Sequence, residues 1–375
     1  NKSYIGLGYS PTRLPNVILR NVLENPGWYT AYTPYQAEIS QGTLHYIFEF
    51  QSMMAELTGL PIANASMYDG STATAEAAIM AVASGKKANR VLVSETVDDK
   101  ILAVIRTYTH FQGVQIEVVP AEDGATSRTA MQEKLQQGGV AGMIVQQPNK
   151  YGIIENYDGF ADDCHQQKAL FVMNSVAADL ALLKSPGELG ADIAVGDGQS
   201  LGIPMQFGGP SVGYLCCTEK LMRKMPGRIV GQTKDNRGQR AFVLTLQARE
   251  QHIRREKATS NICSNQSLMA LWVTIYLSVM GKEGLKEAAQ MSVDGAHYLY
   301  EKLIQSGKFK PAFNQPFFNE FCVKYVGGDL DQLQQRLFDN GILGGIKMAD
   351  DMLMLAVTEK RTKEEVDLLV SLVTQ

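Results

Sequence analysis

Apolar and polar residues follow two different periods along this chain of 375 residues. Between Leu44 and Thr58 the apolar positions recur every three or four residues, which predicts a helix that ends at Gly59. From about residue 62 onward, short apolar runs alternate with segments of helical period. Strands separated by ten to fifteen helical residues need crossover connections, so the pattern predicts an α/β protein with a mostly parallel, buried sheet.

The predicted strands are 62–67, 90–94, 116–119, 141–145, 170–173, 193–195 and 214–217, and the predicted helices between them are 71–84, 99–111, 130–136 and 157–167. A helix over about 265–280, ended by Gly281, is expected to lead out of the sheet. The segments 285–305, 317–325, 330–340, 352–357 and 363–373 then predict helix, strand, helix, strand and helix. We therefore expect an N-terminal arm and interface segment (1–60), a large domain (61–280) and a small C-terminal α/β domain (281–375).

The composition indicates an ordinary cytoplasmic protein, with 45% hydrophobic and 20% charged residues. A net charge of −4 argues against a nucleic-acid partner. Five cysteines, an odd number without metal-ligand spacing, predict a reducing compartment and no metal site. We find no signal peptide and no apolar run of membrane length, so no membrane contact is expected. Because the chain starts at Asn1, we expect that an N-terminal piece is missing.

One candidate binding turn is Asp69-Gly70-Ser71-Thr72, which lies between a predicted strand and an alanine-rich predicted helix. Free N–H groups and the helix dipole at such a position suit a phosphate. The alternative is a simple helix cap by Asp69 or Ser71, which needs no ligand.

A second candidate is the segment 29–42, which carries three tyrosines spaced by three residues and a proline that forbids a regular helix. Tyrosines on irregular backbone favour a recognition surface, because the ring supplies contact area and the hydroxyl a hydrogen bond. The alternative is a packed surface loop.

A third candidate is the segment 228–257, with eight basic and three acidic residues. It predicts either a solvated charged face or a wall that binds carboxylates through arginine.

The segments 29–42, 62–70, 194–205 and 247–263 together resemble the P-protein of the glycine cleavage system. More narrowly, the chain is similar to the α subunit of the bacterial type in which this enzyme is split into two related chains. The resemblance runs from about Gly6 to near the C-terminus and implies the fold of fold-type-I transferases that bind pyridoxal phosphate (PLP).

The resemblance allows four cofactor anchors to be checked one at a time. The phosphate turn keeps its form at residues 69–72, as a vestige of a cofactor site. A ring-stacking histidine is missing from 96–99, and Asn174 stands where an aspartate would hold the pyridine nitrogen. Gln199 and Ser200 occupy the positions of the histidine and the Schiff-base lysine in the catalytic subunit. Since serine forms no imine, we expect no covalent PLP and no catalytic residue in this chain's own site.

The resemblance also implies the partners. PLP is expected in a catalytic β subunit, in an α2β2 assembly that decarboxylates glycine and transfers the aminomethyl group to the lipoylated H-protein. Because fold-type-I sites lie between two protomers, this chain is expected to contribute side chains to the partner's active site: Tyr32, Thr33, Tyr35, Ser40 and Gln41. Three arginines are expected to face carboxylates or the carrier protein: Arg249, Arg254 and Arg255.

Two alternatives remain at this stage. The chain could be a self-sufficient PLP enzyme that uses Lys184 or Lys220, although both lie at the wrong step of the strand pattern. It could also be a scaffold or regulatory subunit that only stabilises the catalytic chain, because a fold alone does not fix function.

Overall fold

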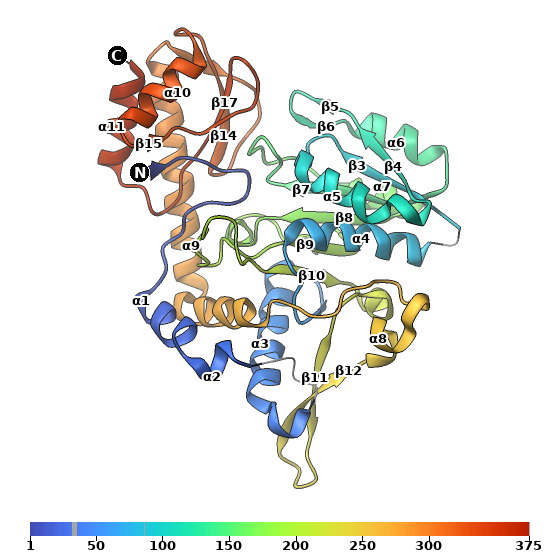
Figure 1. Cartoon of the computed structure of the whole chain (residues 1–375). Coiled ribbons are helices and arrows are strands. Elements are labelled where there is room, and N and C mark those ends of the chain that lie inside the picture. Colours follow the sequence, from blue (N-terminus) through green and yellow to red (C-terminus); the bar gives the residue numbers. More distant parts are fainter. Residues whose placement is uncertain (32–35, 86, 375) are drawn as a thin grey trace.

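A computed structural model describes residues 1–31, 36–85 and 87–374. Its centre is a seven-stranded sheet with the order β2-β10-β9-β8-β7-β3-β4 (Figure 1). The strands from β9 to β4 run parallel, whereas β10 is antiparallel to both of its neighbours. The prediction of a mostly parallel sheet is confirmed. The strands are β2 (Ile62–Ala63), β3 (Arg90–Ser94), β4 (Gln115–Val119), β7 (Val140–Gln147), β8 (Leu170–Ser175), β9 (Ile193–Asp197) and β10 (Gly213–Cys217).

Both faces of this sheet are covered by helices, which explains why its strands are apolar without alternation. On β8, Val172 packs with the helices of one face, whereas Phe171 and Met173 pack with those of the other. The first face carries α4 (Gly70–Ser84) and α5 (Asp99–Thr109), and the second carries α6 (Arg128–Gln136) and α7 (Phe160–Gln166). These helices lie where the sequence predicts them.

A third layer packs against the end of the sheet that holds β2 and β10. It consists of α3 (Gln41–Thr58) and the first half of α9 (Ser267–Gln305). The fully buried Trp272 of α9 donates its indole N–H to the carbonyl of Gly202 over 3.0 Å. The predicted break at Gly281 is confirmed, because its φ of 61° and ψ of −176° interrupt the helix.

Helix α9 corrects one expectation, since an apolar run of membrane length does exist. Among the described residues, α9 is the one helix that could cross a membrane by length and composition, with a mean hydropathy of 1.2 in its most apolar window. A core helix passes the same test, and 44% of that window is buried inside the molecule. Trp272 of the same helix is fully buried.

The second half of α9 supports a smaller antiparallel sheet with the order β13-β14-β17-β16. Its strands are β13 (Phe309–Pro311), β14 (Glu320–Tyr325), β16 (Ile346–Lys347) and β17 (Met352–Ala356), and its helices are α10 (Leu330–Asp339) and α11 (Lys363–Thr374). The first strand of the chain, β1 (Lys2–Ser3), pairs in parallel with β15 (Ile342–Leu343) beside this sheet. The start of the predicted N-terminal arm is therefore packed on the small domain, with Tyr4 fully buried there.

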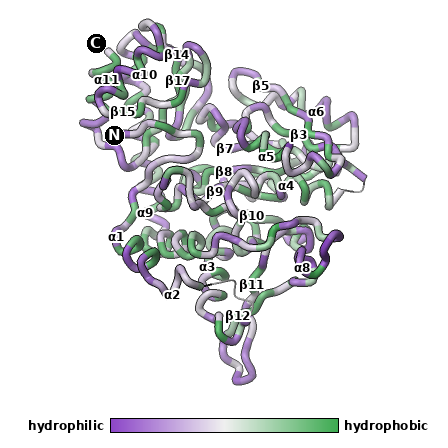
Figure 2. The backbone as a smooth tube through the Cα atoms, in the orientation of Figure 1, coloured by the Kyte–Doolittle hydropathy of each residue, from purple (hydrophilic) through white to green (hydrophobic). Residues whose placement is uncertain are grey.

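A hairpin of β11 (Ile229–Lys234) and β12 (Arg240–Thr245) projects from the body and was not predicted (Figure 1). On β12, Phe242 and Leu244 are buried near α3, while the alternate residues Ala241, Val243 and Thr245 are more exposed. This alternation is typical of a strand with one solvated face, but the charged turn between the strands conceals it in the sequence. Figure 2 shows hydrophilic residues at the hairpin tip and around α8 (Gln251–Arg254). The remaining short elements are α1 (Asn16–Ile18), α2 (Pro26–Tyr29), β5 (Ala121–Glu122) and β6 (Ala125–Thr126).

Helix α4 buries an ionisable side chain in the middle of the large domain. Glu76 is 6% exposed and accepts a hydrogen bond of 2.7 Å from the Ser260 hydroxyl, while its second carboxyl oxygen has no hydrogen-bond partner in the part of the chain that the structure describes. Burial raises the pKa of Glu76 to about 7, although the Ser260 hydrogen bond opposes the shift. The folded protein therefore holds a proton that the unfolded chain releases in mildly acidic solution.

We predict that Glu76 makes the free energy of unfolding fall as pH rises from about 4.5 to about 7, because the folded state binds the extra proton in that window. The Glu76→Gln variant keeps an acceptor for Ser260 without the charge. It should remove this pH dependence and raise the free energy of unfolding at pH 8 by up to about 3 kcal/mol. Urea unfolding at pH 5 and pH 8 measures both effects. The exposed Glu56→Gln on α3 is the control, and an equal response of the two variants would contradict the prediction.

Candidate functional site

A cavity of about 310 Å³ lies where β7, β8 and β9 end and where α4 begins. This is the edge of a parallel sheet at which ligands usually bind. Residues 5–9 of the N-terminal segment line one side of it. The remaining lining residues are Gly70, Ser71, Asp98, Lys100, Ile101, Gln146, Asn174, Ser175, Val176, Asp197, Met205 and Ile346.

The predicted phosphate turn forms the first turn of α4, and it does cap the helix. The Asp69 carboxylate accepts the Thr72 N–H over 2.9 Å, and the Thr72 hydroxyl in turn accepts the Asp69 N–H over 3.3 Å. The Gly70 N–H is not directed at open space. It donates to the Asp197 carboxylate over 2.9 Å, so a side chain of this protein occupies the position that the turn offers to an anion.

The Asp197 carboxylate, at the end of β9, accepts hydrogen bonds from four donors. One oxygen accepts from Gly70 N–H and from the Tyr9 hydroxyl, both over 2.9 Å. The other accepts from the Gln199 N–H over 2.8 Å and from the Ser211 hydroxyl. Burial raises the pKa of Asp197, and the hydrogen bonds from Ser211 and Gly70 act in the opposite direction.

Gln199, predicted at the histidine position, binds the N-terminal segment. Its side-chain amide accepts the Ser10 N–H over 3.1 Å and donates to the Ser10 carbonyl over 3.0 Å. It also donates to the carbonyl of Ile203, and its side chain is buried. This side chain is therefore a structural clamp.

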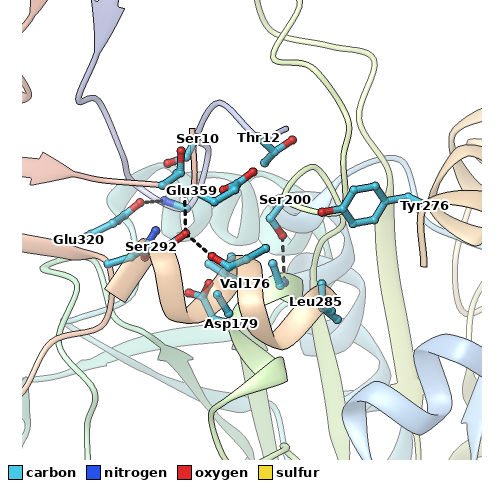
Figure 3. A pocket seen from close by; sticks show the side chains of 16 residues that line it. Ser10, Thr12, Val176, Asp179, Ser200, Tyr276, Leu285, Ser292, Glu320 and Glu359 are labelled. Carbon is cyan, nitrogen blue, oxygen red and sulfur yellow. Dashed lines mark hydrogen bonds between the residues drawn. The ribbon is translucent and has the colours of Figure 1, made fainter. Parts of the chain in front are cut away.

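Ser200, at the predicted lysine position, lies at a second and smaller cavity of about 50 Å³. Its hydroxyl accepts the Ala178 N–H over 3.1 Å. Figure 3 shows Ser200 and Tyr276 on one side of this cavity and Glu320 on the other. Asp179 lines the same cavity, and burial together with the nearby Glu320 raises the pKa of Asp179 well above its ordinary value.

Asn174, at the predicted aspartate position, lies on the wall of the larger cavity. Its amide donates to the Thr74 hydroxyl of α4 over 2.7 Å. On the segment expected to carry a stacking histidine, the buried Thr96 hydroxyl donates to Glu155 over 2.7 Å, away from this cavity's lining. Lys184 pairs with Asp158 at 3.2 Å on the surface and lines neither cavity, and Lys220 is exposed. Lys100, on α5, lines the larger cavity.

These residues do not fit a PLP cofactor. The position that the turn offers to a phosphate is occupied by Asp197, the positions where the resemblance implies an imine lysine and a ring-nitrogen carboxylate carry Ser200 and Asn174, and Tyr9 lines the same cavity as Asp197. A carboxylate at the helix N-terminus would repel a phosphate dianion at contact distance.

The N-terminal segment is the part of this site that the sequence analysis missed. Leu7 and Gly8 donate their N–H groups to the two oxygens of Glu320 over 3.1 and 3.0 Å. A Cβ atom on Gly6 would lie 2.6 Å from Glu320, so this position requires glycine. The glycines at 6 and 8 are the one sequence signal of such a close approach.

The residues predicted to enter a partner's active site are only partly described. Tyr32, Thr33 and Tyr35 lie outside the described residues. Ser40 is the residue before α3 and is half-buried. Gln41 is used within the chain, because its side-chain amide pairs with both backbone groups of Phe242 over 2.8 Å and so fastens β12 to α3.

The three predicted carrier-facing arginines separate into two kinds. Arg249 points inward, where it donates to the carbonyls of Met225 and Gly227, and burial lowers its pKa. These contacts hold the Arg249 guanidinium within the chain and speak against a carrier-facing role, which stays a prediction. Arg254 and Arg255 are exposed on α8 and just after it. Across the described ranges no group of His, Cys, Asp and Glu side chains is arranged to hold a metal ion.

Comparison with known proteins gives consistent results. A family model described as glycine cleavage system P-protein matches residues 1–373. The chain is 49% identical to a protein from Moorella thermoacetica over 98% of its own length and 84% of the relative's, and 48% identical to one from Geobacillus kaustophilus over 98% and 83%. Both relatives are named probable glycine dehydrogenase (decarboxylating) subunit 1.

Solved structures confirm the fold. A crystal structure of glycine decarboxylase (P-protein) of the glycine cleavage system, in inhibitor-bound form, is 40% identical with a TM-score of 0.92, over 100% of this chain and 84% of the other. An alanine–glyoxylate aminotransferase from Nostoc sp. is 16% identical with a TM-score of 0.69, over 98% and 93%, which establishes the fold alone. The predicted fold-type-I PLP-transferase architecture is confirmed, and this chain belongs to the glycine cleavage system P-protein family.

Proposed function

We propose that this chain is the α subunit of a two-chain glycine decarboxylase and that it binds no PLP itself. A catalytic β subunit holds the cofactor, which supplies the electron sink for loss of the glycine carboxylate. The complex decarboxylates glycine and passes the aminomethyl group to the lipoyl arm of H-protein. The observation that carries this proposal is the occupation of the anion position on α4 by Asp197, together with Ser200 where a lysine would be needed.

The reason to retain such a chain is the shared active site. In this fold the substrate site lies at the boundary of two protomers, so a subunit without its own chemistry still supplies half of the other site's wall. The segment 29–42 is the proposed contribution, with Tyr32, Thr33, Tyr35 and Ser40 as donors of contacts. Gln41 was predicted to contribute as well, but it is left out of this proposal because its amide is bound to Phe242 within the chain.

The proposed assembly is an α2β2 heterotetramer in the cytoplasm. The subunit number in the names of the relatives supports a partner chain, and the cysteine content supports a reducing compartment. A pure scaffold is the second candidate function, since the described cavities contain no catalytic arrangement. A self-sufficient PLP enzyme is disfavoured by the positions of Lys184 and Lys220.

We expect the purified chain to be colourless with PLP and inactive alone. When the chain is mixed with PLP, no absorbance band of an imine that borohydride abolishes should appear. The reason is that Ser200, which lines the smaller cavity, stands where the imine-forming lysine would be needed. Glycine/bicarbonate exchange, measured for this chain, the catalytic chain and the co-expressed pair, should require the pair. A yellow preparation of this chain that exchanges label unaided would refute the proposal.

We expect the Tyr32→Phe/Tyr35→Phe double variant to lower exchange by the co-expressed pair about 10- to 100-fold, which corresponds to the loss of one or two hydrogen bonds to the reacting complex. Gel filtration should give the wild-type assembly. Tyr29→Phe, an exposed tyrosine of the same segment, is the matched control and should exchange normally. Loss of assembly together with activity would favour the scaffold function, and full activity would exclude the proposed contribution.

We expect Arg254→Glu/Arg255→Glu to raise the KM for H-protein several-fold at low salt, if the carrier is acidic, with the difference fading above about 0.5 M salt because exposed charges are screened. The kcat should stay unchanged. Lys234→Glu on the hairpin is the control for a general change of surface charge. A salt-independent KM, equal for both variants, would remove these arginines from the carrier surface.

A further inference from the structure

The residues that line the larger cavity do not fit a cofactor that carries a phosphate, and one side chain is the main reason. We propose that the Asp197 carboxylate is a built-in anion that occupies the phosphate position at the N-terminus of α4, and that residues 5–10 cover it, so that the chain closes its own anion site.

The first support is the chemistry of the position. The N-terminus of this 15-residue helix has positive dipole potential and a free N–H at Gly70, which together attract an anion. The Gly70 N–H binds Asp197 over 2.9 Å. With two acceptor bonds on each oxygen, the carboxylate uses about four acceptor positions, which is its full capacity.

The second support is the absence of space between helix and strand. A Cβ atom on Gly70 would lie 2.7 Å from the backbone nitrogen of Asp197 and 2.9 Å from the carbonyl carbon of Gly196. The end of β9 is thus packed directly on the first residue of α4. A phosphate could reach the Gly70 N–H only if the Asp197 side chain left.

The third support is the way residues 5–10 are held over the Asp197 carboxylate. Tyr9 donates its hydroxyl to Asp197, and the same segment is held on one side by Gln199 and on the other by Glu320. Its start is anchored by Tyr4, which is fully buried in the small domain. The cover therefore spans both domains and needs no other chain to stay closed.

The cavity behind this cover still has the wall of a polar site. Ser175 lines it, and the Ser175 hydroxyl is 1% exposed without a hydrogen-bond partner among the described residues. A buried hydroxyl without a partner is unusual in a folded protein, so this end of β8 stays polar. Removing Asp197 would leave the Gly70 N–H without its acceptor and should therefore open an anion site.

The test is a titration of the full chain with inorganic phosphate, in which calorimetry and phosphorus NMR detect binding. The wild-type chain should give no saturable binding up to about 10 mM, whereas Asp197→Gly should bind at least about tenfold more tightly, because a like charge is removed and the Gly70 N–H is released. Asp197→Asn keeps an acceptor for Gly70 but no charge, and it should give a smaller gain than the glycine variant.

Asp98→Asn is the matched control, since it removes another carboxylate that lines the same cavity but does not contact Gly70. Saturable phosphate binding by the wild type, or an equal gain in the Asp98 variant, would overturn the proposal. So would the absence of any gain in Asp197→Asn and Asp197→Gly when near-UV circular dichroism reports the native fold. This inference rests on the same Asp197 contact as the proposed function, but the measurement involves no glycine turnover, so its failure can be told apart from a failure of the exchange assay.

Discussion

One carboxylate organises the centre of this protein. Asp197 joins the first turn of α4, the loop that follows β9 and the N-terminal segment, since each of the three donates to it. A buried carboxylate is costly unless donors surround it, and here backbone and hydroxyl groups supply four hydrogen bonds. The arrangement fixes the helix start against the sheet and leaves no free anion-binding N–H at Gly70.

The N-terminal segment depends on further acidic side chains in the same way. Residues 5–13 are irregular, so their N–H groups have no ladder partner and need acceptors elsewhere. Glu320 accepts from Leu7 and Gly8, and Glu359 accepts from Arg13. Burial raises the pKa of both carboxyl groups, while the same hydrogen bonds oppose the shift. The segment thereby connects the seven-stranded sheet with the smaller antiparallel sheet, beside two cavities that residues near both sheets line.

The fold of this chain and the residues of its candidate site differ in how far they match a PLP enzyme. The helices on both faces of the sheet keep the fold of the P-protein family, as the TM-score of 0.92 to a family structure shows. The positions at which the resemblance implies cofactor anchors carry internal contacts here, with Asn174 bound to Thr74 and Gln199 bound to Ser10. Family membership and a filled site are compatible, because the buried core depends on volume and pattern whereas catalysis depends on a few side chains.

The sequence by itself determined the order of the elements, the parallel sheet and the family. Those properties follow from local period and from long motifs, as in the agreement of 90–94 with β3 and of 71–84 with α4. It also predicted that Ser200 and Asn174 stand in place of an amine and a carboxylate, since the residue type at a given position can be read from the sequence alone. The sequence analysis did not predict the hairpin of β11 and β12, because the charged turn of this hairpin concealed the alternating pattern of a half-buried strand.

Only the tertiary structure decided what fills the cavity. Asp197 and Gly70 are 127 residues apart in the chain, and Tyr9 is 188 residues from Asp197, so no local pattern could place them together. The same reason explains Arg249, whose charge suggested a surface role although it is bound to the carbonyls of Met225 and Gly227. Long-range packing decides which buried polar groups form hydrogen bonds with one another. The sequence shows which polar groups are present, but not which of them are in contact.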